Sequence, residues 1–218
     1  MRLNPAAFNR FLNNIGQSFL WRPSDSCPCI SPHSGAARPG CPHCGGKGRI
    51  WHSPRQAKAG VASAKVQREW AESDMWENGD LVLSIPGDSP MWGMGQFDRV
   101  TMLNAADRFS QVMTRGSPTE SLLFKVLKLE RVFWIDPQTE AIVDGGLPDV
   151  SDSGELAWPA GDGPPDGLAY TLVGTKHLDY YVFGDMPRNR NEHHGQRLPK
   201  AAILRRWDML GRGNSAGY

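Results

Sequence analysis

Four cysteines lie within 18 positions of this 218-residue chain, at Cys27, Cys29, Cys41 and Cys44. The segment that holds them, residues 21–51, is rich in Pro, Gly and Ser and has almost no aliphatic side chains. Such a segment cannot form an apolar core of its own, so a metal ion is the natural group to order it. Four thiolates in tetrahedral geometry make a closed Zn²⁺ site, in which the ion is structural and not catalytic.

The two cysteine pairs differ in spacing. Two residues separate Cys41 from Cys44, as in half of a zinc knuckle, and the glycines that follow allow backbone N–H groups to approach the sulfurs. This half is similar to part of the cysteine-rich module of a class of heat-shock co-chaperones. A single proline separates Cys27 from Cys29, whereas zinc ribbons usually have two residues between paired cysteines. The sequence therefore predicts a zinc module that differs from a standard finger.

Other interpretations of these thiols stay open. They can be reduced spectators, or a redox pair with a reactive thiolate and a reversible disulfide. His33 and His43 lie inside the same segment and can each replace a thiolate as a ligand. We expect synthesis in a reducing cytosol and no membrane association, because we find no signal peptide and no run of about 18 apolar residues. Structural disulfides are rare in that compartment.

The residues before the cysteines predict an amphipathic helix over residues 1–20. Asn4 is a suitable N-cap, and Pro5 suits the first helical position. Apolar residues recur at helical spacing along one face, at Phe8, Phe11, Leu12, Ile15 and Phe19. This face can pack on its own domain or dock on a neighbouring subunit.

From about residue 61 the dominant period is two, which is typical of strands. We expect strands at residues 66–70, 81–85, 97–103, 109–114, 170–173, 177–183 and 200–207, and a hairpin over 122–143. Asp136 and Pro137 match the first two positions of a type I turn in that hairpin. The predicted fold is mainly β, a barrel or sandwich with an N-terminal helix. We expect a zinc-knuckle module over 21–58 and a β-barrel-like domain over 59–218.

Charge is balanced overall but segregated locally. Lys plus Arg total 24 and Asp plus Glu total 23, so no global field attracts nucleic acid. Residues 144–167 hold six acidic residues, four prolines and no Lys or Arg, which predicts a long exposed loop. The C-terminal part is basic, and its candidate intersubunit or DNA-facing residues are Arg188, Arg190, Arg197 and Lys200. In a ring of identical copies, the acidic loop of one copy can pair with the basic tract of the next.

Motifs of common enzyme classes are not evident. We find no G-x-S-x-G elbow, no phosphate-cradling glycine loop and no H-E-x-x-H pair. This favours a structural or binding protein over an enzyme.

The order of several segments resembles the neck proteins of tailed bacteriophages, which are head-closure or head–tail connector proteins. The segments are C-P-C…C-P-H-C-G-G-K-G-R-I-W, then K-V-Q-R-E-W, G-D-L-V-L-S-I-P and Q-F-D-R-V. The resemblance covers most of the chain, from about residue 21 to 210. It implies a virion protein with a β-barrel fold that forms a hexameric or dodecameric ring. It also implies contacts with portal or adaptor proteins, with tail proteins and with packaged DNA in the channel.

A nucleic-acid-binding zinc knuckle is the main alternative. Zinc knuckles often contact DNA or RNA, and the basic residues Lys47, Arg49, Arg55 and Lys58 follow the cysteines. The balanced net charge argues against strong non-specific binding, which depends on neutralising phosphates. The sequence leaves this alternative open.

Overall fold

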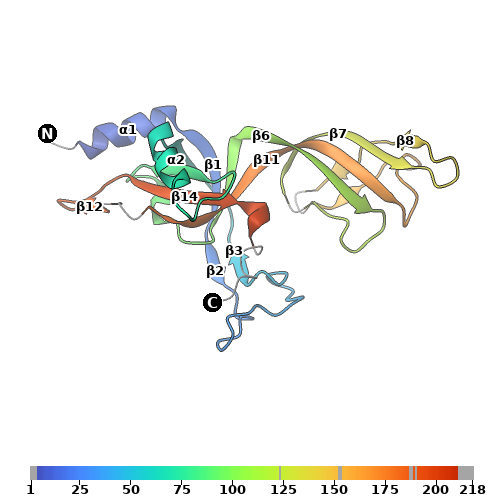
Figure 1. Cartoon of the computed structure of the whole chain (residues 1–218), viewed down its shortest axis with the longest axis horizontal. Helices are drawn as coiled ribbons and strands as arrows, with labels where there is room; N and C mark the ends of the chain where they lie inside the picture. The colour runs from blue at the N-terminus through green and yellow to red at the C-terminus, as the bar shows by residue number, and fades with distance from the viewer. Residues whose placement is uncertain (1–3, 123, 152–153, 187–188, 190, 211–218) are drawn as a thin grey trace. The chain divides into compact units, whose positions relative to one another are not determined.

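The computed structural model describes residues 4–122, 124–151, 154–186, 189 and 191–210. The fold is mainly β, as the sequence predicted, and begins with a helix (Figure 1). It divides into two compact units. Unit 1 comprises the described residues of Met1–Asn104 and Asp179–Tyr218, and unit 2 comprises those of Ala105–Leu178.

In these described residues, helices are few and short. The α-helices are α1 (Pro5–Ile15) and α2 (Ala64–Ala71), and the 3-10 helices are η1 (Pro90–Gly93) and η2 (Trp207–Met209). Within the described ranges, none of these helices combines the length and apolar character that crossing a membrane requires.

Eight strands form the main sheet, in the order β14-β5-β4-β1-β6-β11-β7-β8. Their bounds are β1 (Gln17–Arg22), β4 (Arg55–Val61), β5 (Leu81–Ile85), β6 (Arg99–Thr114), β7 (Val126–Ile135), β8 (Ile142–Asp144), β11 (Ala169–Asp185) and β14 (Lys200–Arg206). Three small antiparallel pairs accompany it: β2 (Ser24–Ser26) with β3 (Arg49–Trp51), β9 (Asp149–Val150) with β10 (Leu156–Ala157), and β12 (Glu192–His193) with β13 (Gln196–Arg197).

Unit 1 contains a closed ring of six strands. Strand β14 pairs with β5 on one side and with β11 on the other, so β14, β5, β4, β1, β6 and β11 each have two neighbours. The sequence predicted either a barrel or a sandwich, and the strands of unit 1 form a barrel. Small barrels are filled by side chains, and each of these strands supplies nearly solvent-free apolar residues, among them Phe19, Ala59, Leu83, Ile85, Val100, Val182 and Leu204.

Unit 2 has its own apolar core on parts of β6, β7 and β11, with β8 at the edge of the sheet. The buried members are Phe109, Met113, Leu122, Val132, Tyr170 and Leu172. The predicted hairpin is confirmed as β7 and β8, which pair antiparallel from Ile135 opposite Ile142. Its turn is organised by Asp136, whose carboxylate accepts hydrogen bonds from the Gln138 amide and the Thr139 hydroxyl, at 2.8 Å and 3.0 Å.

The N-terminal helix is shorter than predicted. It ends at Ile15, and Gly16 takes an extended conformation that leads into β1. Phe19 therefore lies on a strand, where it is fully buried opposite Ala57 and Met102. Burying the whole ring in the barrel stabilises the strand more than a place on a surface helix would. The prediction of a helix to residue 20 was wrong in this respect.

Residues 66–70 are helical and not a strand, because they belong to α2. Val66 and Trp70 fit both periods, since a spacing of four residues is two steps of an alternating strand and about one helical turn. Packing decides between them: Trp70 is buried against Val82 and Ile203, on a face of the barrel's strands that α2 covers.

The acidic segment 144–167 is more ordered than a loop. It contains the β9–β10 hairpin, and Leu156 and Trp158 pack against the core of unit 2. Trp158 also meets the ring of Tyr170 edge-on, with 5.1 Å between the ring centroids. The described acidic side chains are exposed, while apolar residues between them anchor the segment to the core of unit 2.

Candidate metal centre

The cysteine segment is a loop closed by a short ladder. Cys27 directly follows β2, and Gly48 directly precedes β3. The two strands pair with Ser26 opposite Arg49, and the Cys27 amide donates to the Gly48 carbonyl at 2.8 Å. The ladder therefore brings the first and last parts of the loop together. The predicted site, shared by both cysteine pairs, needs this proximity.

All four predicted ligands meet. The thiol sulfurs of Cys27, Cys29, Cys41 and Cys44 lie within 4.8 Å of one another. The Sγ–Sγ distance is 3.9 Å between Cys27 and Cys41, and 3.4 Å between Cys29 and Cys44. Sulfurs around a tetrahedral ion with metal–sulfur bonds of about 2.3 Å are about 3.8 Å apart. The cluster thus has the size of a one-ion tetrathiolate site.

The site is enclosed by the protein. Cys27, Cys41 and Cys44 are buried and Cys29 is half-buried, while Ile50 packs against the group. His33 and His43 have exposed side chains, and the cluster of close ligand atoms in the described residues consists of the thiols. The arrangement can hold a metal ion with four protein ligands, which leaves no open position for a substrate.

A glycine turn shapes the second half of the site. Gly45, Gly46 and Gly48 have positive φ angles of 57°, 81° and 71°, a region that favours glycine. The turn lets the Gly48 amide donate to the sulfur of Cys44 at 3.3 Å. Such N–H donors stabilise thiolates and orient them toward an ion.

The thiols differ strongly in acidity. The backbone amides of Cys44 and His43 lower the pKa of Cys41 to about 6, although burial opposes this. The Arg38 amide lowers the pKa of Cys29, but burial and hydrogen bonds to the other three thiols outweigh it and raise this pKa to about 12. Four thiolates this close repel one another, so a cation between them is what allows all four to ionise.

The module is fastened to the barrel by the buried carboxylate of Asp98. One of its oxygens accepts from the indole of Trp21 at 2.7 Å and from the Gly95 amide at 2.9 Å, and the other accepts from the Ser24 amide at 2.8 Å. Trp51, at the end of β3, donates its indole N–H to the Phe97 carbonyl at 3.0 Å. Both strands of the module's ladder are therefore held at fixed points of unit 1.

The predicted basic residues are placed as follows. Arg188 and Arg190 lie outside the described residues. Arg197 is exposed, with its guanidinium 4.7 Å from the centre of the Trp92 ring. Lys200 is buried, and its Nζ lies 3.2 Å from the carboxylate of Asp185.

Sequence reasoning missed a second basic group beside the module. Arg22 and Arg99 lie opposite each other on β1 and β6, near Lys47. They are far apart in the chain, so only the register of the two strands reveals the pair.

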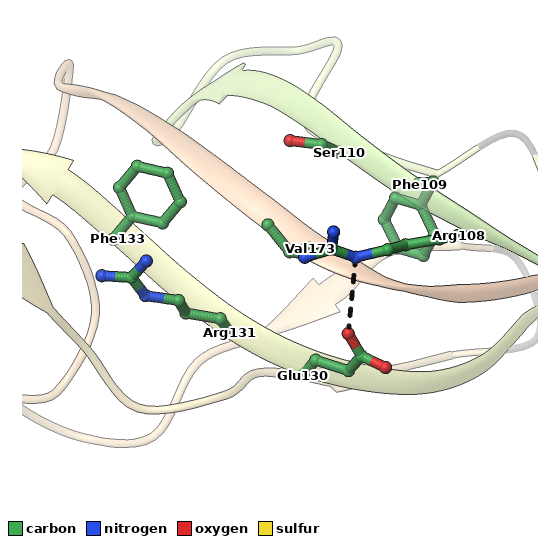
Figure 2. A pocket seen from close by; sticks show the side chains of 7 residues that line it. All are labelled: Arg108, Phe109, Ser110, Glu130, Arg131, Phe133 and Val173. Carbon is green, nitrogen blue, oxygen red and sulfur yellow. Dashed lines mark ion pairs between the residues drawn. The ribbon is translucent and has the colours of Figure 1, made fainter.

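Unit 2 contains a pocket of about 670 Å³, lined by residues of β6, β7 and β11. Figure 2 shows Arg108 and Glu130 facing each other across it, and their charged atoms are 3.8 Å apart. Arg131 lies beside Phe133, with its guanidinium 4.5 Å from the ring centre. The ion pair is largely exposed, so the pocket is an open depression with solvated charges at its surface.

Comparison of the chain with models of known protein families and with curated protein sequences found no match.

Proposed function

We propose that this chain is a non-enzymatic structural protein of the bacteriophage neck, where it forms part of a ring that joins the head to the tail and holds one structural Zn²⁺ ion. The closed group of four thiols is the observation that carries the zinc part of the proposal. The segment order described above and an exposed apolar helix support the rest.

Zinc suits the thiol group better than other common ions. Four sulfur ligands in tetrahedral geometry are typical of Zn²⁺ or of iron–sulfur centres. The sulfur separations match one ion, and the enclosed position suits an ion that braces a loop poor in apolar residues. In this role the module presents a rigid surface without needing a core of its own.

The first helix supports assembly with another copy. Of its apolar residues only Leu12 is buried, while Phe8, Phe11 and Ile15 are 45%, 54% and 58% exposed. Large apolar side chains grouped in this way mark protein–protein contacts. We propose that this face docks on a neighbouring subunit of the ring, the second of the two roles expected for the helix.

The acidic segment and the basic tract supply a second contact between ring neighbours in this proposal. Neutralising Arg188, Arg190 and Arg197 together should weaken assembly and reduce its sensitivity to salt. An oligomer mass that is unchanged at every salt concentration would rule this contact out.

The experiment that tests the whole proposal measures the assembly mass and metal content of the native protein. We expect one zinc per chain and a mass that corresponds to a hexamer or dodecamer. Replacing Phe8 and Phe11 by serine should lower the mass while zinc content stays the same, and Val112→Ser, an exposed apolar residue of unit 2, is the matched control. A wild-type protein that remains monomeric at all concentrations contradicts the ring, and one without zinc contradicts the metal.

A further inference from the structure

Four cations gather where the cysteine module meets the barrel. Lys47 and Arg49 come from the end of the module, and Arg22 and Arg99 come from β1 and β6. Arg22 and Arg99 are direct partners across the two antiparallel strands. All four residues belong to unit 1.

The ring of Trp207 holds two of these cations together. The ammonium of Lys47 lies 5.0 Å from the ring centre, and the guanidinium of Arg99 lies 4.4 Å from it. Trp51 fixes the ring from its edge, with 4.9 Å between centroids. Cation–π contacts of this kind hold long side chains in defined positions near the surface.

Among the described residues the cluster contains four cations, and Asp179 is a carboxylate in contact with it. One oxygen of Asp179 lies 2.6 Å from the guanidinium of Arg99, and the other accepts from the hydroxyl of Thr101. Arg22 is half-buried, and its burial and the charge of Arg99 lower its pKa, although the charge of Asp179 opposes them. Like charges directly opposite each other on neighbouring strands cost stability. The site therefore has an excess of partly desolvated positive charge that an anion would neutralise.

We propose that Arg22, Lys47 and Arg99, with Arg49 beside them, form a binding site for the phosphate backbone of nucleic acid. Guanidinium groups match the geometry of phosphate oxygens, and a lysine adds a point charge. A local cluster can do this even though the net charge of the chain is only +1.

The aromatic residues of the site indicate that it contacts phosphates and does not stack on bases. The ring of Trp207 is already engaged by two cations, and Phe97 has the guanidinium of Arg49 4.4 Å from its centre. Phe97 is also stacked on Tyr181 at 6.3 Å. Binding through charge alone is independent of sequence and falls steeply with salt.

The site lies within one chain and needs no ring, so it does not rest on the proposed neck function. Fluorescence anisotropy with a short labelled DNA single strand, titrated at several salt concentrations, tests it directly. Each phosphate contact is worth about fivefold in affinity near 0.1 M salt, from a slope of about 0.7 per contact. The double variant Arg22→Gln/Lys47→Gln should therefore bind about 25-fold more weakly, with a salt slope smaller by about 1.4.

A matched double variant controls for net charge. Lys65 and Arg68 are exposed cations on α2, so Lys65→Gln/Arg68→Gln should bind as the wild type does. The single variant Arg22→Gln separates binding from folding. It removes a like-charge pair, so it should keep or raise the melting temperature while it weakens binding about fivefold.

Several results would overturn the proposal. They are no binding by the wild type at low salt, an equal loss of affinity in the α2 control, or a lower melting temperature for Arg22→Gln with unchanged binding. A competition experiment distinguishes a site for the nucleic-acid backbone from a site for other anions. If poly-glutamate or inorganic phosphate displaced the DNA as well as unlabelled strand did at equal charge, a nucleic-acid site would be excluded.

Discussion

The thiol of Cys44 illustrates how single residues determine the module. It is buried, it lies 3.4 Å from the sulfur of Cys29, and it accepts a hydrogen bond from the Gly48 amide. Cys44 therefore links the other half of the thiol group to the glycine turn, and no other side chain can take its place in both contacts.

We predict that Cys44→Ser abolishes stoichiometric zinc binding and leaves residues 27–48 open to proteolysis. Structural zinc in small modules contributes on the order of 10 kcal/mol of apparent folding free energy, and three thiolates hold the ion much less well. Metal analysis and limited proteolysis measure this. His43→Ala is the control, because this exposed side chain should not affect zinc content; an equal loss in both variants would mean that the thiols are not the ligand set.

Glu120 is a single residue that organises part of unit 2 through its hydrogen bonds. Its carboxylate accepts from the Gly116 amide at 2.7 Å, the Tyr170 hydroxyl at 2.9 Å and the Trp158 indole at 3.1 Å. Burial acts to raise the pKa of Glu120, but these donors and the charge of Arg115 hold it below its usual value. The charged form is thus the one that the folded unit stabilises.

We predict that Glu120→Gln lowers the free energy of unfolding by about 1–3 kcal/mol at neutral pH. Because the folded pKa lies below the unfolded one, the stabilisation is complete above the usual Glu pKa of about 4.3 and is lost as pH falls through the folded value. Urea unfolding of both proteins from pH 7 to 3 should show the difference shrinking below about pH 4.3. Glu130→Gln, at an exposed ion pair, should differ little from wild type; a gap that grows in acid would contradict the prediction.

For individual side chains, the sequence revealed contacts between residues that are close in the chain. The four cysteines are close in the chain and needed only a turn to meet, so they were predictable. The pairing of Arg22 with Arg99, and of Trp21 with Asp98, depends on strands distant in sequence. Local patterns contain no information about that register.

Among the elements, α1 has one buried side chain, Leu12, and the Asn9 carboxamide accepts a hydrogen bond from the Gly87 amide at 3.0 Å. Leu12 is buried near Gly60, where an added Cβ would lie 2.8 Å from the Leu12 side chain. The Asn4 carboxamide accepts from the Ala7 amide at 3.1 Å and caps the helix start, as the sequence predicted. The rest of the apolar face is exposed.

We predict that Leu12→Ala costs about 2–5 kcal/mol of stability or releases α1 from the barrel. Phe11→Ala, one position earlier and more than half exposed, should change the stability of the isolated chain by no more than about 0.5 kcal/mol. Thermal unfolding of the monomer compares the two directly. Equal losses would show that the exposed face is packed in solution.

Element type was predictable where turn residues or a single period decide it. The β7–β8 hairpin has a run of β-branched and aromatic residues before a turn whose first two residues are Asp136 and Pro137, and it formed as expected. The α2 segment fits two periods, and burial of Trp70 selected the helix. The end of α1 was misplaced because Phe19 continues the helical spacing but is buried in the barrel.

For the whole molecule, the two units have separate cores, and the thiol group belongs to unit 1. We predict that a chelator speeds hydrogen exchange in residues 27–48 while amides of β7 and β8 keep their protection. Opening free energies differ between cooperative regions, so loss of an ion is felt first by the region that it orders. Exchange measured by mass spectrometry with and without chelator tests this, and an equal loss of protection in unit 2 would contradict it.

A mainly β chain was predictable from alternation and turn residues, but closure of the barrel was not. Closure depends on β14 pairing with both β5 and β11, and no local pattern specifies two partners for one strand.

The same pairing has a consequence for biosynthesis. The six barrel strands leave the ribosome in order, and Lys200–Arg206 is the last of them. Until it emerges, β5 and β11 each expose an unpaired edge of the kind that recruits strands from other chains. A nascent chain arrested before Lys200 would therefore be prone to aggregate, whereas release of seven further residues removes both edges at once.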